Sequence, residues 1–246
     1  MSSIINSFNP DLTVSFSSPE AARVSFGLGI KHYIFNDSPH ATAVARLTIP
    51  LVDRLFCPWV IPVKEWTKFG LEKDKITTYK ALDPIVWIKK ELDNNNNQEI
   101  IELKKTLKID EEKKIVLIRP EEVKASYIAD KNVKNSIELI DEIVNSFSDN
   151  YNILILARYK DQIDFYKNRF EKKIGIKVIE IVTDGFLLLK LTDLFIGAGG
   201  TMSAEAALIG KPVISIAPIN FLETKYFVKS IAIESIYYFT KYYFYH

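Results

Sequence analysis

The chain is poor in cysteine and histidine, and neither sign of charge is in excess. Its one cysteine, Cys57, excludes an internal disulfide and a cysteine-based metal cluster, and the apolar segment RLFCPW around it predicts a buried structural thiol. The three histidines, His32, His40 and His246, lie too far apart in the sequence for a zinc motif. With 32 basic and 31 acidic residues, the formal charge of +1 argues against a general nucleic-acid-binding protein.

Long apolar runs are also absent. No apolar stretch approaches the ~18 residues that a membrane-spanning helix needs, and the amino terminus lacks the basic and apolar regions of a signal peptide. Apolar residues make up 48% of the chain and charged residues 26%, which is ordinary for a globular protein. We therefore expect a cytoplasmic protein with a sizeable core, divided into one large or two small domains.

Short apolar runs of β-forming residues alternate with helical patterns, which is typical of parallel βαβ units. A strand is expected from Leu12, and Ser18, Pro19 and Glu20 form an N-cap, a first-turn proline and an acidic first turn for the helix that follows. Later helices are expected over 41–49, 63–69, 133–147, 161–170, 186–191 and from about 203, and later strands over 32–35, 76–79, 115–119, 153–157, 177–182 and 194–196.

These patterns predict an α/β fold with two Rossmann-like halves and parallel sheets. The polar run at residues 94–97 is poor in helix and strand formers and is placed where the first set of units ends. We predict a partial amino-terminal Rossmann-like domain over 1–90, a linker region and helix over 91–112, and a carboxy-terminal nucleotide-binding domain over 113–246.

Residues 193–212, DLFIGAGGTMSAEAALIGKP, run from an apolar strand through a glycine-rich turn into a helix. Gly197, Gly199 and Gly200 lack a Cβ and let a ligand lie against the backbone, while the free N–H groups of the helix favour an anion such as a diphosphate. Glu205 follows about one turn later, where its carboxylate can accept hydrogen bonds from a ribose. Tight packing of the strand against the helix is the alternative role for the glycines.

Several cations follow the ends of neighbouring strands. Arg119, Lys124 and Ser126 lie in or after the segment IVLIRP, and Arg158 ends the segment ILILAR. Cations at the carboxyl ends of parallel strands can neutralise a diphosphate, and Ser126 lies in the same loop as Lys124. The alternatives are a solvated turn after Arg119 and a surface ion pair between Arg158 and Asp161.

The segment FNDSPHA places Asn36, Asp37 and His40 in the loop after an apolar strand, the usual location for chemistry in an open α/β sheet. A carboxylate and an imidazole three residues apart can share a proton or flank a sugar hydroxyl. Alternatively, Asn36 and Asp37 form a turn, and Asp37 or Ser38 caps the next helix.

The glycine-rich turn, followed by Thr201, Glu205-Ala and Gly-x-Pro, resembles the nucleotide-binding signature of the carboxy-terminal domain of GT-B glycosyltransferases. Together with FNDSPHATAVARLTIPLVDR and IRPEEVKASY, it makes most of residues 10–226 similar to an uncharacterised, largely archaeal family, domain of unknown function number 354. Members of that family are predicted to be glycosyltransferases with a GT-B-like fold, and the family is similar to the UDP-N-acetylglucosamine 2-epimerases. FNDSPHA is similar to the H-x-E-A-G region of those epimerases, with Asp37 at their acidic position, and Arg46 falls where they have N-R-x-L-T.

The resemblance implies a sugar-nucleotide-binding protein, with glycosyl transfer from a UDP-sugar as the expected activity. A UDP-sugar 2-epimerase-like enzyme and a catalytically silent nucleotide-binding scaffold are the alternatives. It also implies further βα units before Leu12 and a longer carboxy-terminal segment, so we expect a chain truncated at both ends, with the first half incomplete.

The predicted site follows from the motifs and the resemblance together. The catalytic residues are expected to be Asp37 and His40, and the substrate-binding residues Asn36, Arg46, Arg119, Lys124, Ser126, Arg158, Gly197, Gly199, Gly200, Thr201 and Glu205. Because no Asp-x-Asp metal motif is present, we expect neither a metal nor a cofactor beyond the UDP-sugar substrate. The aromatic segment 237–245 is expected to be buried against the core, with peripheral membrane contact as the alternative.

Overall fold

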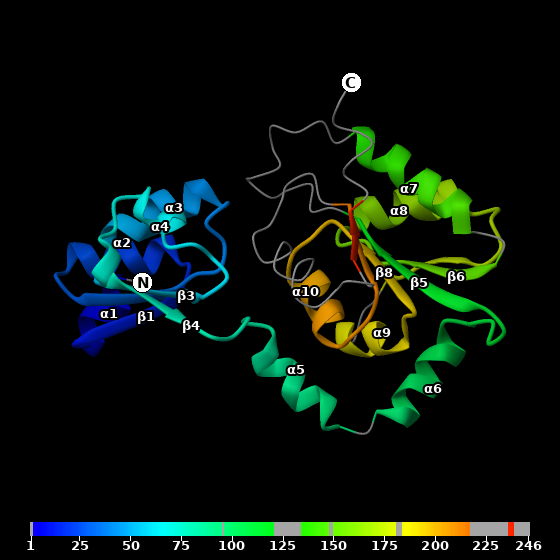
Figure 1. The fold of residues 1–246 in the computed structure, drawn as a ribbon, viewed down its shortest axis with the longest axis horizontal. Coiled ribbons are helices and arrows are strands. Elements are labelled where there is room, and N and C mark those ends of the chain that lie inside the picture. The colour runs from blue at the N-terminus through cyan, green and yellow to red at the C-terminus, as the bar shows by residue number, and fades with distance from the viewer. Residues whose placement is uncertain are drawn as a thin grey trace. The chain divides into compact units, whose positions relative to one another are not determined.

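The computed structural model describes residues 2–94, 96–120, 134–147, 150–180, 184–216 and 236–238. The chain forms two compact units, Met1–Asp83 and Pro84–His246 (Figure 1). Each unit contains one parallel β-sheet, so the predicted α/β class with two parallel-sheet halves is confirmed. The two units meet in sequence at Asp83 and Pro84, whereas the sequence predicted a first domain ending at residue 90.

The first unit is built on a four-stranded sheet with the order β1-β2-β3-β4, in which all strands are parallel. Helices α2 and α3 pack against each other on one side of this sheet (Figure 1). The elements of the unit are α1 (Ser2–Phe8), β1 (Leu12–Phe16), α2 (Pro19–Gly27), β2 (Lys31–Phe35), α3 (Thr42–Thr48), the 3-10 turn η1 (Ile49–Leu51), β3 (Arg54–Pro58), α4 (Lys64–Thr67), the 3-10 turn η2 (Lys73–Lys75) and β4 (Ile76–Tyr79).

Local sequence signals account for the start of α2. The Ser18 side chain accepts a hydrogen bond from the backbone N–H of Ala21 at 3.2 Å, and Pro19 and Glu20 occupy the first turn. This is the predicted cap, because a serine oxygen satisfies a donor that has no partner within the helix.

One face of the first sheet is closely packed and includes a buried histidine. Cys57 is fully buried beside Leu55, as predicted for a structural thiol, and burial raises the pKa of its thiol to about 11. His32 is also fully buried, with its ring nitrogens 2.7 Å from the Thr13 hydroxyl and 3.0 Å from the Ser15 hydroxyl. Burial lowers the pKa of His32, because the charged imidazolium loses its hydration there.

The second unit is built on a six-stranded parallel sheet with the order β10-β9-β8-β5-β6-β7. Helices α7 and α8 lie on one face and α9 and α10 on the other (Figure 1). The elements are α5 (Ile85–Leu92), α6 (Asn97–Thr106), β5 (Lys114–Arg119), α7 (Lys134–Phe147), β6 (Tyr151–Ile155), α8 (Lys160–Phe170), β7 (Ile176–Val178), α9 (Gly185–Leu191), β8 (Leu194–Gly197), α10 (Thr201–Leu208), β9 (Val213–Ser215) and β10 (Ile236–Tyr238).

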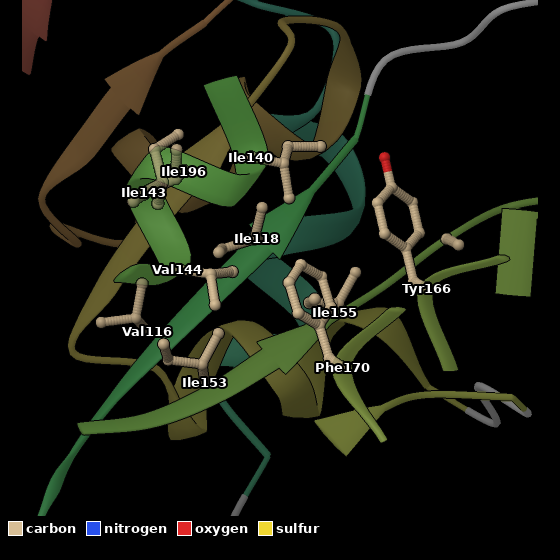
Figure 2. Packing of buried hydrophobic residues seen from close by; sticks show 11 residues of the cluster. Val116, Ile118, Ile140, Ile143, Val144, Ile153, Ile155, Tyr166, Phe170 and Ile196 are labelled. Atoms are coloured by element: carbon tan, nitrogen blue, oxygen red, sulfur yellow. The ribbon is translucent and has the colours of Figure 1, made fainter. Parts of the chain in front are cut away.

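The core of the second unit lies between β5, β6 and the helices α7 and α8. Four consecutive residues of β5 are buried, as expected for a central strand covered on both faces. Figure 2 shows Ile140 and Val144 of α7 packed toward Val116 and Ile118 of β5. This core fixes the carboxyl ends of β5 and β6, where the predicted arginines lie.

The connection between α5 and α6 is held to the second unit by Lys190 of α9. The Lys190 ammonium donates to the Glu91 carbonyl at 3.0 Å and to the Asn96 side-chain oxygen at 2.6 Å. Lys211 in turn donates to the Lys190 carbonyl at 2.8 Å. The polar run expected in a linker region is thus bound by a lysine from another helix.

Candidate functional site

The glycine-rich turn lies at the carboxyl end of β8, which pairs with β5 on one side and β9 on the other. Gly199 and Gly200 have φ values of 85° and 80°, a left-handed conformation that side chains disfavour. The two glycines turn the chain so sharply that α10 begins at Thr201, two residues before the predicted start. The turn therefore ends directly at a helix N-terminus, whose first N–H groups lack acceptors within the helix.

The glycines of the turn differ in what surrounds them. A Cβ at Gly197 would lie 2.4 Å from the Phe195 ring and 3.0 Å from the Ser203 hydroxyl, whereas a Cβ at Gly200 would meet no atom within 4 Å. Close packing thus accounts for Gly197, and open space borders Gly200. The hydroxyl oxygen of Ser203, also in the first turn of α10, is buried and has no hydrogen-bond partner among the described residues.

Two of the three predicted arginines lie at the carboxyl ends of neighbouring strands, β5 and β6. Arg119 is half-buried and is paired in register with Gly197, and its carbonyl accepts from the N–H of Ala198 at 3.3 Å. Arg158 follows β6 and is exposed, and its N–H donates to the Gln162 side chain at 3.2 Å. The structure brings Arg119 to the glycine-rich turn and places Arg158 one strand away. The other two predicted residues of this group, Lys124 and Ser126, lie outside the described residues.

Glu205 lies one turn into α10 and is half-buried. Its carboxylate oxygen Oε1 accepts a hydrogen bond from the indole N–H of Trp87 at 2.7 Å. Trp87 belongs to α5 and was not predicted as a site residue, because 118 positions separate it from Glu205 and no local motif joins them.

In the first unit, Asn36, Asp37 and His40 follow β2. Asn36 is buried, and its side-chain oxygen accepts from the N–H of Ser38 at 2.8 Å, so the turn given as the alternative is present. Asp37 accepts from the Ser38 hydroxyl at 2.7 Å. Neither Asp37 nor Ser38 caps the next helix, because α3 begins after Ala41 and has no side-chain cap.

His40 lies close enough to Asp37 for the two side chains to interact electrostatically. Burial lowers the pKa of His40, and the negative charge of Asp37 opposes that shift more weakly. Since the lowered pKa favours the neutral ring, His40 can accept a proton at neutral pH. Arg46 lies further along, exposed on α3.

Two further polar residues at the same end of the first sheet were not predicted. Tyr79 ends β4, and its hydroxyl donates to the carboxyl group of Asp83. The second oxygen of Asp83 is buried and has no hydrogen-bond partner in the described part of the chain. Burial raises the pKa of Asp83, the hydrogen bond from Tyr79 opposes this shift, and the nearby charge of Asp37 adds to it more weakly. The sequence signal was their position at the end of a strand and in the loop after it, since a tyrosine and an aspartate four residues apart form no recognised motif.

The described residues contain neither a metal-ligand cluster nor a membrane-spanning helix. No group of three or more histidine, cysteine or acidic side chains there is arranged to hold a metal ion. No helix of this part of the chain is long and apolar enough to cross a bilayer.

The two parallel-sheet units and the glycine-rich turn define a GT-B-like α/β protein. The fold matches the UDP-GlcNAc 2-epimerase of Neisseria meningitidis bound to UDP-GlcNAc, with a TM-score of 0.71 and 16% identity over 93% of this chain and 64% of that one. It equally matches the UDP-GlcNAc 2-epimerase of Methanocaldococcus jannaschii in complex with UDP-GlcNAc and UDP, with a TM-score of 0.71 and 18% identity over 96% of this chain and 67% of that one. Anabaena HepE in complex with UDP and glucose matches with a TM-score of 0.59 and 15% identity over 87% and 62% of the two chains.

The chain belongs to the family described as Protein of unknown function (DUF354), whose model matches residues 1–237. It is 25% identical over 229 residues to the uncharacterized protein MJ0665 of Methanocaldococcus jannaschii. That alignment covers 90% of this chain but 62% of the relative, so the chain spans less than two thirds of the relative's length. The resemblance stated from the motifs is therefore confirmed at the level of the family and the fold.

Proposed function

We propose that the second unit binds a UDP-sugar at the glycine-rich turn. In this assignment Gly199, Gly200 and Thr201 hold the diphosphate and Glu205 accepts from the ribose. Arg119 and Arg158 supply positive charge from the neighbouring strand ends, and Lys124 and Ser126 keep their predicted role in binding. Structural neighbours that bind UDP or UDP-sugars support the choice of nucleotide.

The conformation at Gly200 is the observation that supports this assignment most strongly. A left-handed glycine with open space beside it immediately precedes a helix N-terminus. Backbone N–H groups there favour negative charge through both hydrogen bonding and the helix dipole. A diphosphate can lie against that backbone only because no side chain occupies the space.

We further propose that the first unit supplies acid–base chemistry for glycosyl transfer. The neutral His40 ring can take the proton of an acceptor hydroxyl, and the charge of Asp37 stabilises the imidazolium that forms. Backbone N–H groups at α10 stabilise the leaving diphosphate. Asp37→Asn and His40→Ala are each expected to lower turnover about 10²–10⁴-fold while UDP binding is kept.

A UDP-sugar 2-epimerase activity is the second candidate. The observation that favours it is the pair of carboxyl groups in the first unit, because burial raises the pKa of Asp83 while Asp37 lies near enough to raise it further. A carboxyl group whose pKa is raised by burial can keep its proton and act as an acid. Assays for both UDP release and sugar epimerisation, on one UDP-sugar series, separate the two activities.

A thermal melt with matched glycine variants tests the binding site. UDP at 100 times its dissociation constant should add about 2.7 kcal/mol to the free energy of unfolding of the wild-type chain. Gly200→Val should abolish this shift. Gly210→Val is the matched control, because Gly210 also has a positive φ, 77°, and open space, but lies after the other end of α10.

Both valine variants place a side chain at a positive φ, so both should melt at a lower temperature than the wild type without UDP. Only Gly200→Val should lose the response to UDP. An equal response in both variants, or no response to any nucleoside diphosphate in the wild-type chain, would contradict the proposed site.

A further inference from the structure

Trp87 contacts the carboxylate that we assign to the ribose. Its indole N–H donates to Oε1 of Glu205 at 2.7 Å, linking α5 to α10. The Trp87 side chain is 43% exposed, so burial of the ring in the core does not explain its position. An indole N–H is a donor only, and a carboxylate is an acceptor only, so the pair is chemically matched.

The backbone that presents Trp87 is fixed by other contacts of α5. Ile88, the next residue, is fully buried. The carbonyl of Glu91, at the carboxyl end of the helix, accepts from Lys190 at 3.0 Å. A helix anchored at these two points holds the indole at a defined place beside α10, and the ring itself has two rotatable bonds.

A glutamate side chain has more rotatable bonds, and ordering it costs conformational entropy. The hydrogen bond from Trp87 uses one oxygen of Glu205 and limits the orientations of the carboxylate. The second oxygen, Oε2, then has a defined direction from which it can accept a hydrogen bond. Preorganisation of this kind raises affinity because the ligand does not have to order the side chain.

We propose that Trp87 is the positioning residue of the ribose site: its indole holds Glu205 so that the second carboxylate oxygen receives a ribose hydroxyl. This inference rests on the proposed binding of a UDP-sugar at α10. It assigns recognition of the ribose to a residue of α5 that does not belong to the glycine-rich segment.

Titration calorimetry with three ligands on the full chain tests the assignment. UDP has the ribose hydroxyls, 2′,3′-dideoxyuridine diphosphate lacks them, and pyrophosphate lacks the whole nucleoside. Trp87→Phe should weaken UDP binding about 10-fold, the lower range for a hydrogen bond to a charged group. Binding of the dideoxy analogue and of pyrophosphate should stay within about 2-fold of the wild type, well under the loss of that bond. Trp59→Phe, which removes an indole from the first unit, is the matched control and should bind all three ligands like the wild type.

Unchanged UDP affinity in Trp87→Phe would overturn the positioning role while leaving the proposed function intact. Equal weakening of all three ligands would also overturn it, because that result indicates a general disturbance of α10. If the wild-type chain binds none of the three ligands, the proposed function itself fails, and the role of Trp87 fails with it.

A second measurement does not depend on the folding of a variant. In the ¹⁵N-labelled wild-type chain, UDP should shift the indole N–H resonance of Trp87, whereas pyrophosphate should leave it in place. An indole resonance that responds equally to both ligands, or to neither when UDP is bound, would contradict the inference.

Discussion

Gly197 provides a test of the packing of the glycine-rich turn, because a methyl group added at this position would overlap with one identified side chain. In Gly197→Ala the new Cβ would lie 2.4 Å from one carbon of the Phe195 ring and 2.8 Å from another. Phe195 is fully buried, so its ring cannot move without displacing other core side chains. Overpacking of this kind costs about 1–3 kcal/mol. We therefore expect the melting temperature to fall by roughly 2–4 °C for each kcal/mol.

Gly185→Ala is the matched control within the same unit. A Cβ at Gly185 would meet only the end of the Met202 side chain, at 3.8 Å, which is ordinary contact. Alanine at this first position of α9 should therefore be tolerated within about 0.5 kcal/mol. Both variants are to be compared with the wild type by circular dichroism during thermal and urea unfolding.

A double-mutant cycle identifies the collision partner. Phe195→Leu removes the ring that the new methyl group would meet, so Gly197→Ala should cost less in that background, with a coupling of about 0.5–3 kcal/mol. Wild-type stability in Gly197→Ala, or the same cost in both backgrounds, would refute the packing role assigned to this glycine.

Two further predictions concern the first unit. Burial lowers the pKa of His32 below its ordinary value of 6.5, so the unfolded chain binds the proton more readily than the folded chain. The free energy of unfolding should therefore be full above pH 6.5 and fall as the pH drops below it. Urea unfolding between pH 8 and 5 should show a steeper loss in the wild type than in His32→Gln, and parallel curves would contradict the role of His32. Tyr79→Phe removes the donor to Asp83 and should lower the free energy of unfolding by about 1–3 kcal/mol. Most of that loss should disappear when the same substitution is made in the Asp83→Ala variant. An undiminished loss would show that it comes from packing of the tyrosine ring and not from the hydrogen bond.

Features set by neighbouring residues could be predicted from the sequence. The cap formed by Ser18 and the first-turn proline needs only a few consecutive residues, and it is present as predicted. The alternation of apolar runs and helical patterns was sufficient for the parallel-sheet class, because the length of each run distinguishes strands from helices.

Features that depend on distant residues could not be predicted. The hydrogen bond between Trp87 and Glu205 spans 118 positions, and the buried Asp83 oxygen results from the folding of β4 and the loop after it. The start of α10 was placed two residues late, because the left-handed conformation of Gly199 and Gly200 is not visible in their identity. For the same reason the sequence did not distinguish Gly197, which is packed, from Gly200, which borders open space.

A crystal structure of the full chain with UDP is the most direct test of the central claim. We expect the diphosphate to contact the backbone of Gly199, Gly200 and Thr201, with a ribose hydroxyl within hydrogen-bond distance of the Glu205 carboxylate. UDP bound elsewhere on the chain, with the space beside Gly200 unfilled, would contradict the assignment of the glycine-rich turn as a sugar-nucleotide site.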